Sequence, residues 1–328
     1  MALGIALRMT RGLALSALAL FGSQSAVHAA QWPDRPVRIV LPGPPGSSPD
    51  RITRLLSDKL SKKWGQPIVI DNKPGGSTRI GSEIVARAAP DGYTLLSTFM
   101  SHSMVRLLYP DTPYDPVADF TPIVPFVNAE TALIVGGDSP YRTLAELAAD
   151  VKRRGRPLTV GNYGVGTSFH FYALQLGKGL GIDVLPVPYT GEALSLAALL
   201  GGHIEANFNS IGTALPHIRD GKVRALAVGT PQRSRVLPQV PTFAEQGLPE
   251  LVTNAWFGLL GPAGMPQPVV ARIHDDIQAI LKEPETIKWL RDQGLEPSYA
   301  SPQAFGKTIA DERDRWAKLI KEFNVTVQ

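Results

Sequence analysis

The clearest pattern of apolar and polar positions lies in residues 37–65. Residues 37–41 are β-branched or leucine at four of five positions, which is typical of a short buried strand. A helix is predicted after a short loop, because apolar residues recur there on one helical face: Ile52, Leu55, Leu56, Leu60 and Trp64. Gly65 follows where glycine commonly ends a helix. The stretch therefore predicts a strand, a loop and a helix in succession.

The loop between this strand and this helix is suited to anions. Ser47 or Ser48 can cap the helix, and Pro49 fits its first turn. Asp50 complements the positive end of the helix dipole. Free backbone N–H groups point out of such a helix end, and Gly46 lets a ligand approach the backbone closely. An ordinary strand–helix turn explains the same residues. The interpretation as an anion site therefore depends on the same arrangement of strand, small-residue loop and helix occurring again in the chain.

The alternation of strands and helices continues along the chain and predicts an α/β protein. The predicted strands are residues 68–70, 93–96, 132–135, 158–160, 184–187, 204–208, 224–228 and 256–260. The predicted helices are residues 80–88, 144–153, 169–176, 193–200, 269–281, 285–293 and 305–323. Residues 109–125 are rich in proline and are predicted to be irregular. The strands and helices up to residue 96 are typical of a parallel sheet, whose ligands lie beyond the carboxyl ends of the strands.

Small and polar residues stand at several of these strand ends. Residues 161–168 repeat the first device, since glycines lead to Thr167 and Ser168 before a helix. The spacing differs from a dinucleotide fingerprint, so a second anion-binding helix end is the simpler interpretation. The candidate ligand-binding residues are Gly46, Ser47, Ser48, Asp50, Arg79, Thr98, Ser101, Gly166, Thr167, Ser168, Tyr189 and Asn209.

Two α/β units precede a long C-terminal run of helices. If those helices pack back on the first unit, domain 1 comprises residues 30–128 and 254–328, and domain 2 comprises residues 129–253. Two chain crossings then form a hinge, and ligand pockets favour such interfaces between domains.

Residues 1–29 are predicted to be a cleavable signal peptide. Arg8 and Arg11 precede a short apolar run, residues 13–21, and small residues precede a cleavage point near Ala29. The apolar run is too short to span a bilayer, and the chain has no cysteine for a lipid anchor. We therefore expect a periplasmic protein that is free of a lipid anchor.

Composition and charge exclude some classes of partner. The chain has 328 residues, 44% hydrophobic and 19% charged, which is ordinary for a globular protein and sufficient for two cores. Loss of Arg8 and Arg11 with the signal peptide lowers the formal net charge from +4 to +2. That excess is too small to indicate nucleic acid or a membrane surface as a partner. We expect a monomer.

Short segments along the whole mature chain carry a family resemblance. They are residues 32–40, the Gly/Pro loop ending at Asp50, and residues 71–76, 89–95, 114–116, 187–189, 214–218, 237–242 and 256–264. In this order they resemble the Bordetella-uptake-gene family, the periplasmic substrate-binding proteins of tripartite tricarboxylate transporters. The resemblance implies a type II periplasmic-binding-protein fold, with two domains that close on a small carboxylate and membrane permease subunits as partners. It also implies that residues 46–50 hold a ligand carboxylate while residues 164–168 approach from the other domain.

The sequence departs from this family at three places. Ser47 and Ser48 stand where glycines are usual, so hydroxyls can replace bridging water. Arg79 stands where small residues are common and can reach the cleft as a cation. Asn209 stands where the family usually has aspartate, which suits an ammonium group, whereas asparagine tolerates an acid without an amine. We therefore predict a non-amino dicarboxylate as the ligand.

An aromatic dicarboxylate is an open option within this prediction. Three aromatic residues lie near the candidate loops in the sequence: Phe99, Phe169 and Tyr189.

We expect a receptor rather than an enzyme, with no catalytic residue, no cofactor and no metal. The predicted loops offer hydroxyls, amides and glycine backbone, but no proton-transfer pair. A Ser47 nucleophile paired with His170 would require domain closure, and no Gly-x-Ser-x-Gly elbow supports it. A periplasmic hydrolase and a receptor that presents its ligand to a sensor kinase are the alternatives.

Overall fold

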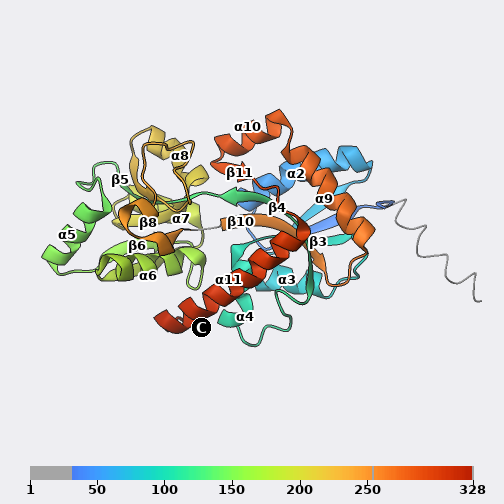
Figure 1. The fold of residues 1–328 in the computed structure, drawn as a ribbon, viewed down its shortest axis with the longest axis horizontal. Coiled ribbons are helices and arrows are strands. Elements are labelled where there is room, and N and C mark those ends of the chain that lie inside the picture. Colours follow the sequence, from blue (N-terminus) through green and yellow to red (C-terminus); the bar gives the residue numbers. More distant parts are fainter. Residues whose placement is uncertain (1–31, 253–254, 327–328) are drawn as a thin grey trace, which may run out of the picture.

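The protein has two α/β lobes, each built on one sheet (Figure 1). The computed structural model describes residues 32–252 and 255–326. The predicted signal peptide, residues 1–29, lies outside the described residues. None of the helices in the described part of the chain is long and apolar enough to cross a membrane.

Lobe 1 contains a six-stranded sheet in the order β11-β4-β10-β3-β1-β2. Its strands are β1 (Val37–Leu41), β2 (Ile68–Asn72), β3 (Thr94–Phe99), β4 (Phe120–Ala129), β10 (Ala255–Pro262) and β11 (Leu295–Pro297). Its helices are α2 (Ser48–Trp64), α3 (Arg79–Ala86), α4 (Val105–Leu108), α9 (Gln267–Leu281), α10 (Pro284–Asp292) and α11 (Pro302–Phe323). β1 pairs in parallel with β2 and β3, whereas β10 runs antiparallel to β3 and β4.

Lobe 2 contains a five-stranded sheet in the order β7-β6-β8-β5-β9. Its strands are β5 (Thr131–Gly136), β6 (Leu158–Asn162), β7 (Val184–Pro188), β8 (Ala206–Ser210) and β9 (Val223–Val228). Its helices are α5 (Leu144–Arg154), α6 (Ser168–Leu180), α7 (Glu192–Leu200) and α8 (Ile211–Arg219). β6 pairs in parallel with β7 and β8, whereas β5 runs antiparallel to β8 and β9.

The two sheets share one topology around β1 and β6. β1 lies between the parallel strands β2 and β3 as β6 lies between β7 and β8, and the next strand is antiparallel in both sheets. In each lobe the loop after this central strand leads into a long helix, α2 or α6. The two candidate loops therefore occupy equivalent positions, at the carboxyl ends of their strands.

Local sequence explains these two helices. α2 buries Ile52, Leu56 and Leu60, which are four residues apart and thus lie on one face. α2 is followed by Gly65 at φ 66°, and α6 by Gly181 at φ 62°. Glycine adopts this left-handed conformation at little cost, which is why both helices stop there.

Two chain crossings and one helix join the lobes. The chain passes from β4 directly into β5, and it returns after a short 3₁₀ turn, Pro249–Leu251, to β10. α11, red in Figure 1, begins on lobe 1 and extends across to α6. Its Trp316 ring lies 5.4 Å from the ring of Phe171 and 6.0 Å from that of Tyr172, centroid to centroid. One apolar cluster thus includes buried residues of both lobes.

The predicted α/β class is confirmed, and the first three predicted strands do pair in parallel. Both sheets also contain antiparallel strands, because β10 and β5 run antiparallel to their neighbours. Two details of the prediction are wrong. Residues 109–125 are not wholly irregular, since β4 begins at Phe120 and its pairing with β10 accommodates two prolines through register shifts. α8 was not predicted, and it contains Pro216. The exact domain limits stay a prediction.

Candidate functional site

The loops at the strand ends of the two lobes meet along a seam. Tyr172 of α6 donates a hydrogen bond from its hydroxyl to Met100 Sδ of lobe 1 (3.7 Å). Burial raises the pKa of Tyr163, and the nearby hydroxyls of Ser168 and Ser101 act in the opposite direction. Because Met100 and Ser101 follow β3 while Tyr163 follows β6, the segment after β3 lies against the segment after β6.

The loops after β1 and β6, here loop A (residues 42–47) and loop B (residues 163–167), have the same internal hydrogen bonds. In loop A, Pro44 O accepts the N–H (3.3 Å) and the hydroxyl (2.7 Å) of Ser47. In loop B, Gly164 O accepts the N–H (3.3 Å) and the hydroxyl (2.7 Å) of Thr167. Ser47 is the N-cap residue of α2, as predicted, but its hydroxyl bonds within the loop rather than to the helix.

A glycine N–H in each loop is held by the third residue of the following helix. Gly46 N–H donates to Asp50 Oδ2 (2.8 Å), and Gly166 N–H donates to His170 Nδ1 (3.0 Å). Both glycines are left-handed, with φ of 79° and 72°. Since the N-cap hydroxyls are used inside the loops, the N–H groups of Ser48 and Asp50 in α2, and of the first three residues of α6, have no intrahelical or N-cap partner. Pro49 has no N–H group.

Asp50 is engaged inside lobe 1, so it positions loop A rather than offering a free carboxylate. Its side chain is 2% exposed and accepts two bonds from Arg54 (both 2.9 Å) and one from Asn72 Nδ2 (3.0 Å). Burial raises the pKa of Asp50, but the hydrogen bonds from Arg54, Gly46 and Asn72 together hold it below the usual value.

Replacing Asp50 by alanine is expected to lower the free energy of unfolding by about 2 kcal/mol, because its hydrogen-bonded donors lose their acceptor. Urea denaturation at pH 7 measures this loss. Asp50→Asn keeps one acceptor for Gly46 and should lose less. The loss should shrink as the pH falls below the ordinary carboxyl pKa, because a carboxylate with a lowered pKa stabilises only while it is ionised. Equal losses in the two variants would show that the bond to Gly46 does not matter.

Buried polar atoms without a hydrogen-bond partner occur at or after the carboxyl ends of strands in both lobes. They are Thr78 Oγ1, Thr98 Oγ1, Ser101 Oγ, Asn162 Nδ2 and Asn209 Oδ1. Each of these residues is at most 1% exposed. An unpaired buried polar atom costs about 1–3 kcal/mol, and most such atoms in proteins are paired. Hydroxyls and carboxamides can bond to carboxylate or hydroxyl groups, so these atoms are suited to a polar ligand.

The segment after β2 combines strained backbone with a paired arginine. Ser77 and Thr78 have positive φ values of 48° and 87°, which is costly for a β-branched residue and is common at ligand sites. Arg79, predicted as a ligand cation, donates to Asp111 Oδ2 (2.9 Å) and lies over the Tyr109 ring. Arg79 is therefore already paired within lobe 1.

A carboxylate that the sequence analysis did not include, Glu192, lies beside Asn209. Asn209 Nδ2 donates to Glu192 O (3.2 Å). Glu192 Oε2 accepts bonds from Ser210 N–H (3.3 Å) and the Thr213 hydroxyl (3.1 Å). Burial raises the pKa of Glu192, which those donors and Arg51 of lobe 1 partly offset. Glu192 therefore adds a titratable group beside the predicted residues, and the signal in the sequence was an acidic residue opening a helix.

The predicted hydroxyl contacts differ in how accessible they are. Ser48, the first residue of α2, is partly exposed. Ser168, the first residue of α6, is buried, and its hydroxyl shares a hydrogen bond with the Tyr163 hydroxyl (2.7 Å). Asn162, which the prediction omitted, ends β6 and accepts Gly164 N–H through Oδ1 (2.9 Å). A polar residue at the end of a central strand was the signal for it.

The three aromatic residues near the loops do not form one platform. Phe169 is 3% exposed and packs edge-on against Tyr163, with centroids 4.7 Å apart, so it belongs to the core of lobe 2. Tyr189 packs against the smaller apolar cluster of lobe 2. Phe99, at the end of β3, is partly exposed and lies close to Gly43 of loop A. Only Phe99 and Tyr189 therefore have ring surface outside the buried core.

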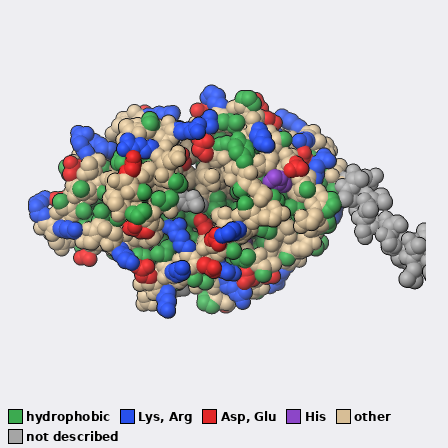
Figure 2. All heavy atoms as spheres, in the orientation of Figure 1, with side chains coloured by type: hydrophobic (Ala, Val, Ile, Leu, Met, Phe, Trp, Pro, Cys, Tyr) green, Lys and Arg blue, Asp and Glu red, His purple; other side chains and the backbone are tan. Residues whose placement is uncertain are grey.

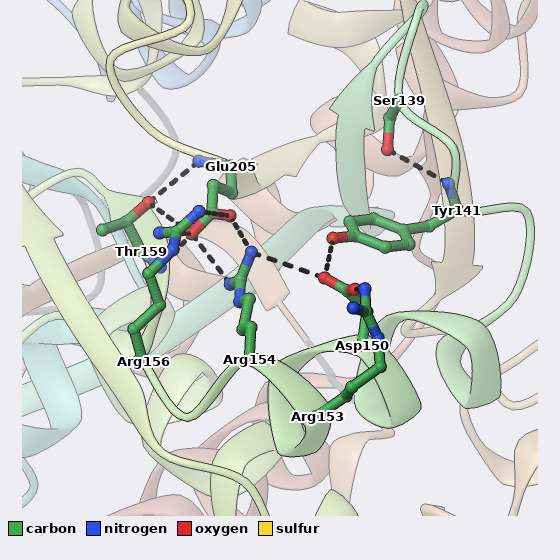
Figure 3. Close-up of polar contacts among 8 residues, drawn as sticks. All are labelled: Ser139, Tyr141, Asp150, Arg153, Arg154, Arg156, Thr159 and Glu205. Atoms are coloured by element: carbon green, nitrogen blue, oxygen red, sulfur yellow. Dashed lines mark hydrogen bonds and ion pairs between the residues drawn. The ribbon is translucent and has the colours of Figure 1, made fainter.

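A cluster of charged side chains lies away from the seam, where α5 meets β6 and the residue before β8 (Figure 3). Glu205 bonds to Arg154 and Arg156, while Asp150 bonds to Arg153 and the Tyr141 hydroxyl. Both carboxylates are matched by arginines, so the cluster holds lobe 2 together. Around it, basic and acidic side chains are interspersed on the face shown in Figure 2. Residues 32–252 and 255–326 contain no group of three or more side chains suited to a metal ion.

Comparison with known proteins places the chain in a family. The model of the tripartite tricarboxylate transporter family receptor matches residues 52–325. The solved periplasmic binding protein BugD is 32% identical and aligns over 90% of this chain and 100% of its own, with a TM-score of 0.80. An R. palustris protein solved with adipate is 32% identical (90% and 99% covered, TM-score 0.83). MatC from Rhodopseudomonas palustris, with bound malate, is 31% identical (88% and 100% covered, TM-score 0.78).

These similarities confirm the predicted fold, since the relatives share the two α/β domains of periplasmic binding proteins. The protein therefore belongs to the tripartite tricarboxylate transporter receptors, the Bordetella-uptake-gene family of periplasmic solute-binding proteins.

Proposed function

We propose that this protein is a periplasmic receptor that binds a small non-amino dicarboxylate between loop A and loop B. It then delivers the ligand to the membrane permease subunits of a tripartite transporter. The observation that carries this proposal is the set of buried, unpartnered hydroxyl and amide atoms at the strand ends of both lobes. Bound adipate and malate in two relatives, both dicarboxylates, support this ligand class.

Hydrogen bonds from the two loops are sufficient to account for the free energy of ligand binding. Each loop leads into a long helix whose first N–H groups are free, and the positive end of a helix favours an anion. Micromolar affinity requires about 8 kcal/mol, and each charge-assisted hydrogen bond contributes about 1.5–3 kcal/mol. A few such bonds to each carboxylate are sufficient. Closure follows if the ligand contacts both loops only in the closed form.

The chemistry beside Asn209 favours an acid without an amine. An ammonium group needs an acceptor with free negative charge. Asn209 is neutral and cannot supply that charge where an aspartate would. An amino acid whose ammonium group lies against Asn209 would therefore lose hydration of that group without gaining an ionic partner at this position.

Isothermal titration calorimetry with malate, adipate, succinate, terephthalate, aspartate and glutamate tests the ligand class. We expect micromolar binding of at least one plain dicarboxylate and weaker binding of both amino acids. Ser101→Ala should weaken the preferred ligand about tenfold, because one hydrogen bond to a charged group is lost. Arg153→Ala, in the charged cluster of Figure 3, is the matched control and should leave affinity unchanged.

Two outcomes would contradict the proposal. Stronger binding of aspartate or glutamate than of every plain dicarboxylate would overturn the ligand class. Recovery of a chemically altered ligand after incubation, detected by mass spectrometry, would identify an enzyme instead of a receptor.

A further inference from the structure

Loop A and loop B differ at one position that their common hydrogen bonds make equivalent. The residue that accepts the glycine N–H is Asp50 after loop A and His170 after loop B. Four residues later α2 has Arg54, which forms two hydrogen bonds with Asp50, whereas α6 has Leu174. Loop A is therefore fixed by a carboxylate whose charge an arginine neutralises, and loop B by an imidazole that needs no counter-charge.

The geometry assigns the proton on this imidazole. A backbone N–H can donate only to a ring nitrogen with a free lone pair, so Nδ1 is unprotonated and the neutral ring carries its proton on Nε2. Burial lowers the pKa of His170, and no charged side chain among the described residues contributes to that shift. Its ring neighbour is Phe171, with centroids 5.7 Å apart. The ring is thus kept in the form that accepts a bond from Gly166.

We propose that His170 is a positioning residue for ligand binding, whose unprotonated Nδ1 holds Gly166, and so loop B, in the anion-binding conformation without adding charge. This inference rests on the proposed function. A carboxylate at position 170 would repel the carboxylate of the ligand, because Leu174 cannot neutralise it as Arg54 neutralises Asp50. Protonation of Nδ1 would turn the acceptor into a donor facing Gly166 N–H, and loop B would be released.

This role predicts an unusual pH dependence. A histidine that merely attracted the ligand would bind it more tightly when protonated at acidic pH. If His170 instead holds loop B through Nδ1, its protonation must weaken the binding of the ligand by the protein. Because burial lowers the pKa of His170 below its usual value, the sign of the change in affinity between pH 8 and pH 4.5 separates the two roles.

Five variants and the wild-type chain test this with malate and adipate as probes, by calorimetry at pH 7.5. His170→Asn keeps a neutral acceptor and should bind within about threefold of wild type, whereas His170→Phe should bind about tenfold more weakly. His170→Asp should also bind at least tenfold more weakly. Adding Leu174→Arg to His170→Asp recreates the Asp50–Arg54 pair and should raise the affinity several-fold above that of His170→Asp. Leu174→Arg alone should leave the affinity of the wild-type chain unchanged.

The pH series completes the test. From pH 8 to pH 4.5 the affinity of the wild-type chain should fall relative to that of His170→Asn. This variant shares the titration of the ligand but lacks the imidazole. Equal affinities of His170→Phe and His170→Asn, or a wild-type affinity that rises relative to His170→Asn in acid, would overturn the inference.

A measurement without ligand separates this inference from the proposed function. Nuclear magnetic resonance of the wild-type chain should show an unprotonated Nδ1 on His170, and exchange of the Gly166 amide proton should accelerate in His170→Phe. If neither probe binds the wild-type chain, the proposed ligand class fails for these acids. The amide exchange then decides the inference, and unchanged exchange in His170→Phe overturns it.

Discussion

Alanine at position 212 is expected to force the two lobes apart. Gly212 lies at the start of α8 in lobe 2, and Gln293 follows α10 in lobe 1. A Cβ atom at position 212 would lie 1.7 Å from Gln293 O and 2.8 Å from its carbonyl carbon. Backbone atoms cannot rotate away as a side chain can, so the lobes must separate there by more than 1 Å. The arrangement described here would no longer form.

Small-angle scattering and calorimetry measure this effect. Gly212→Ala should increase the radius of gyration in the presence of ligand, and it should weaken malate or adipate binding at least tenfold. By helix propensity alone, alanine is more favourable than glycine by about 1 kcal/mol. Weaker ligand binding by Gly212→Ala would therefore have to come from the lost contact between the lobes. Gly43→Ala is the control for scattering, because its Cβ would make only ordinary contacts of 3.5 Å or longer. Unchanged scattering of Gly212→Ala would show that the lobes do not require this contact.

The second large effect concerns Glu312, a buried carboxyl group of α11. Its side chain is 6% exposed, Oε2 accepts a bond from Trp256 Nε1 (3.3 Å), and Oε1 has no partner. Burial raises the pKa of Glu312 to about 7, although Arg315 acts in the opposite direction. In the unfolded chain this carboxyl group has its ordinary pKa of 4.5. Between pH 4.5 and about pH 7, Glu312 therefore keeps its proton in the folded protein but has lost it in the unfolded chain.

Glu312→Gln is therefore expected to raise the free energy of unfolding at pH 8 by about 3 kcal/mol relative to wild type. Below pH 4.5 both states are protonated and the difference should vanish. As the pH rises from 4.5 to 7, the contribution of Glu312 should lower the stability of the wild-type chain, a slope that the variant lacks. Urea denaturation at pH 4.5, 6 and 8 measures it, with Asp314→Asn, an exposed position on α11, as the control. A variant less stable than wild type at pH 8 would contradict the assignment.

The sequence predicts what is local and periodic. The strand, loop and helix from Val37 to Gly65 follow from apolar spacing, a proline at the helix start and a glycine at its end. Loop B was found because it repeats the small residues of loop A. β4 was missed because its prolines resemble a loop, although antiparallel pairing with β10 accommodates them by register shifts.

What the sequence does not reveal depends on contacts between distant residues. The ion pair of Arg79, the predicted ligand cation, with Asp111 cannot be read from the sequence, because the two residues are 32 positions apart. Glu192 reaches the neighbourhood of Asn209 only because α7 and β8 adjoin. The equivalence of Asp50 and His170 emerges only when their hydrogen bonds to glycine are compared, since a carboxylate and an imidazole share no sequence pattern.

The helix that crosses both lobes restricts how the molecule can open. Separating α6 from α11 would uncover Trp316 together with Phe171 and Tyr172. Each such ring buries about 150–250 Å², at about 25 cal/mol per Å², so the cost would be several kcal/mol. A rotation that keeps these rings in contact avoids that cost. We therefore expect the lobes to rotate about their contact with α11 and to separate on the side of the molecule away from it.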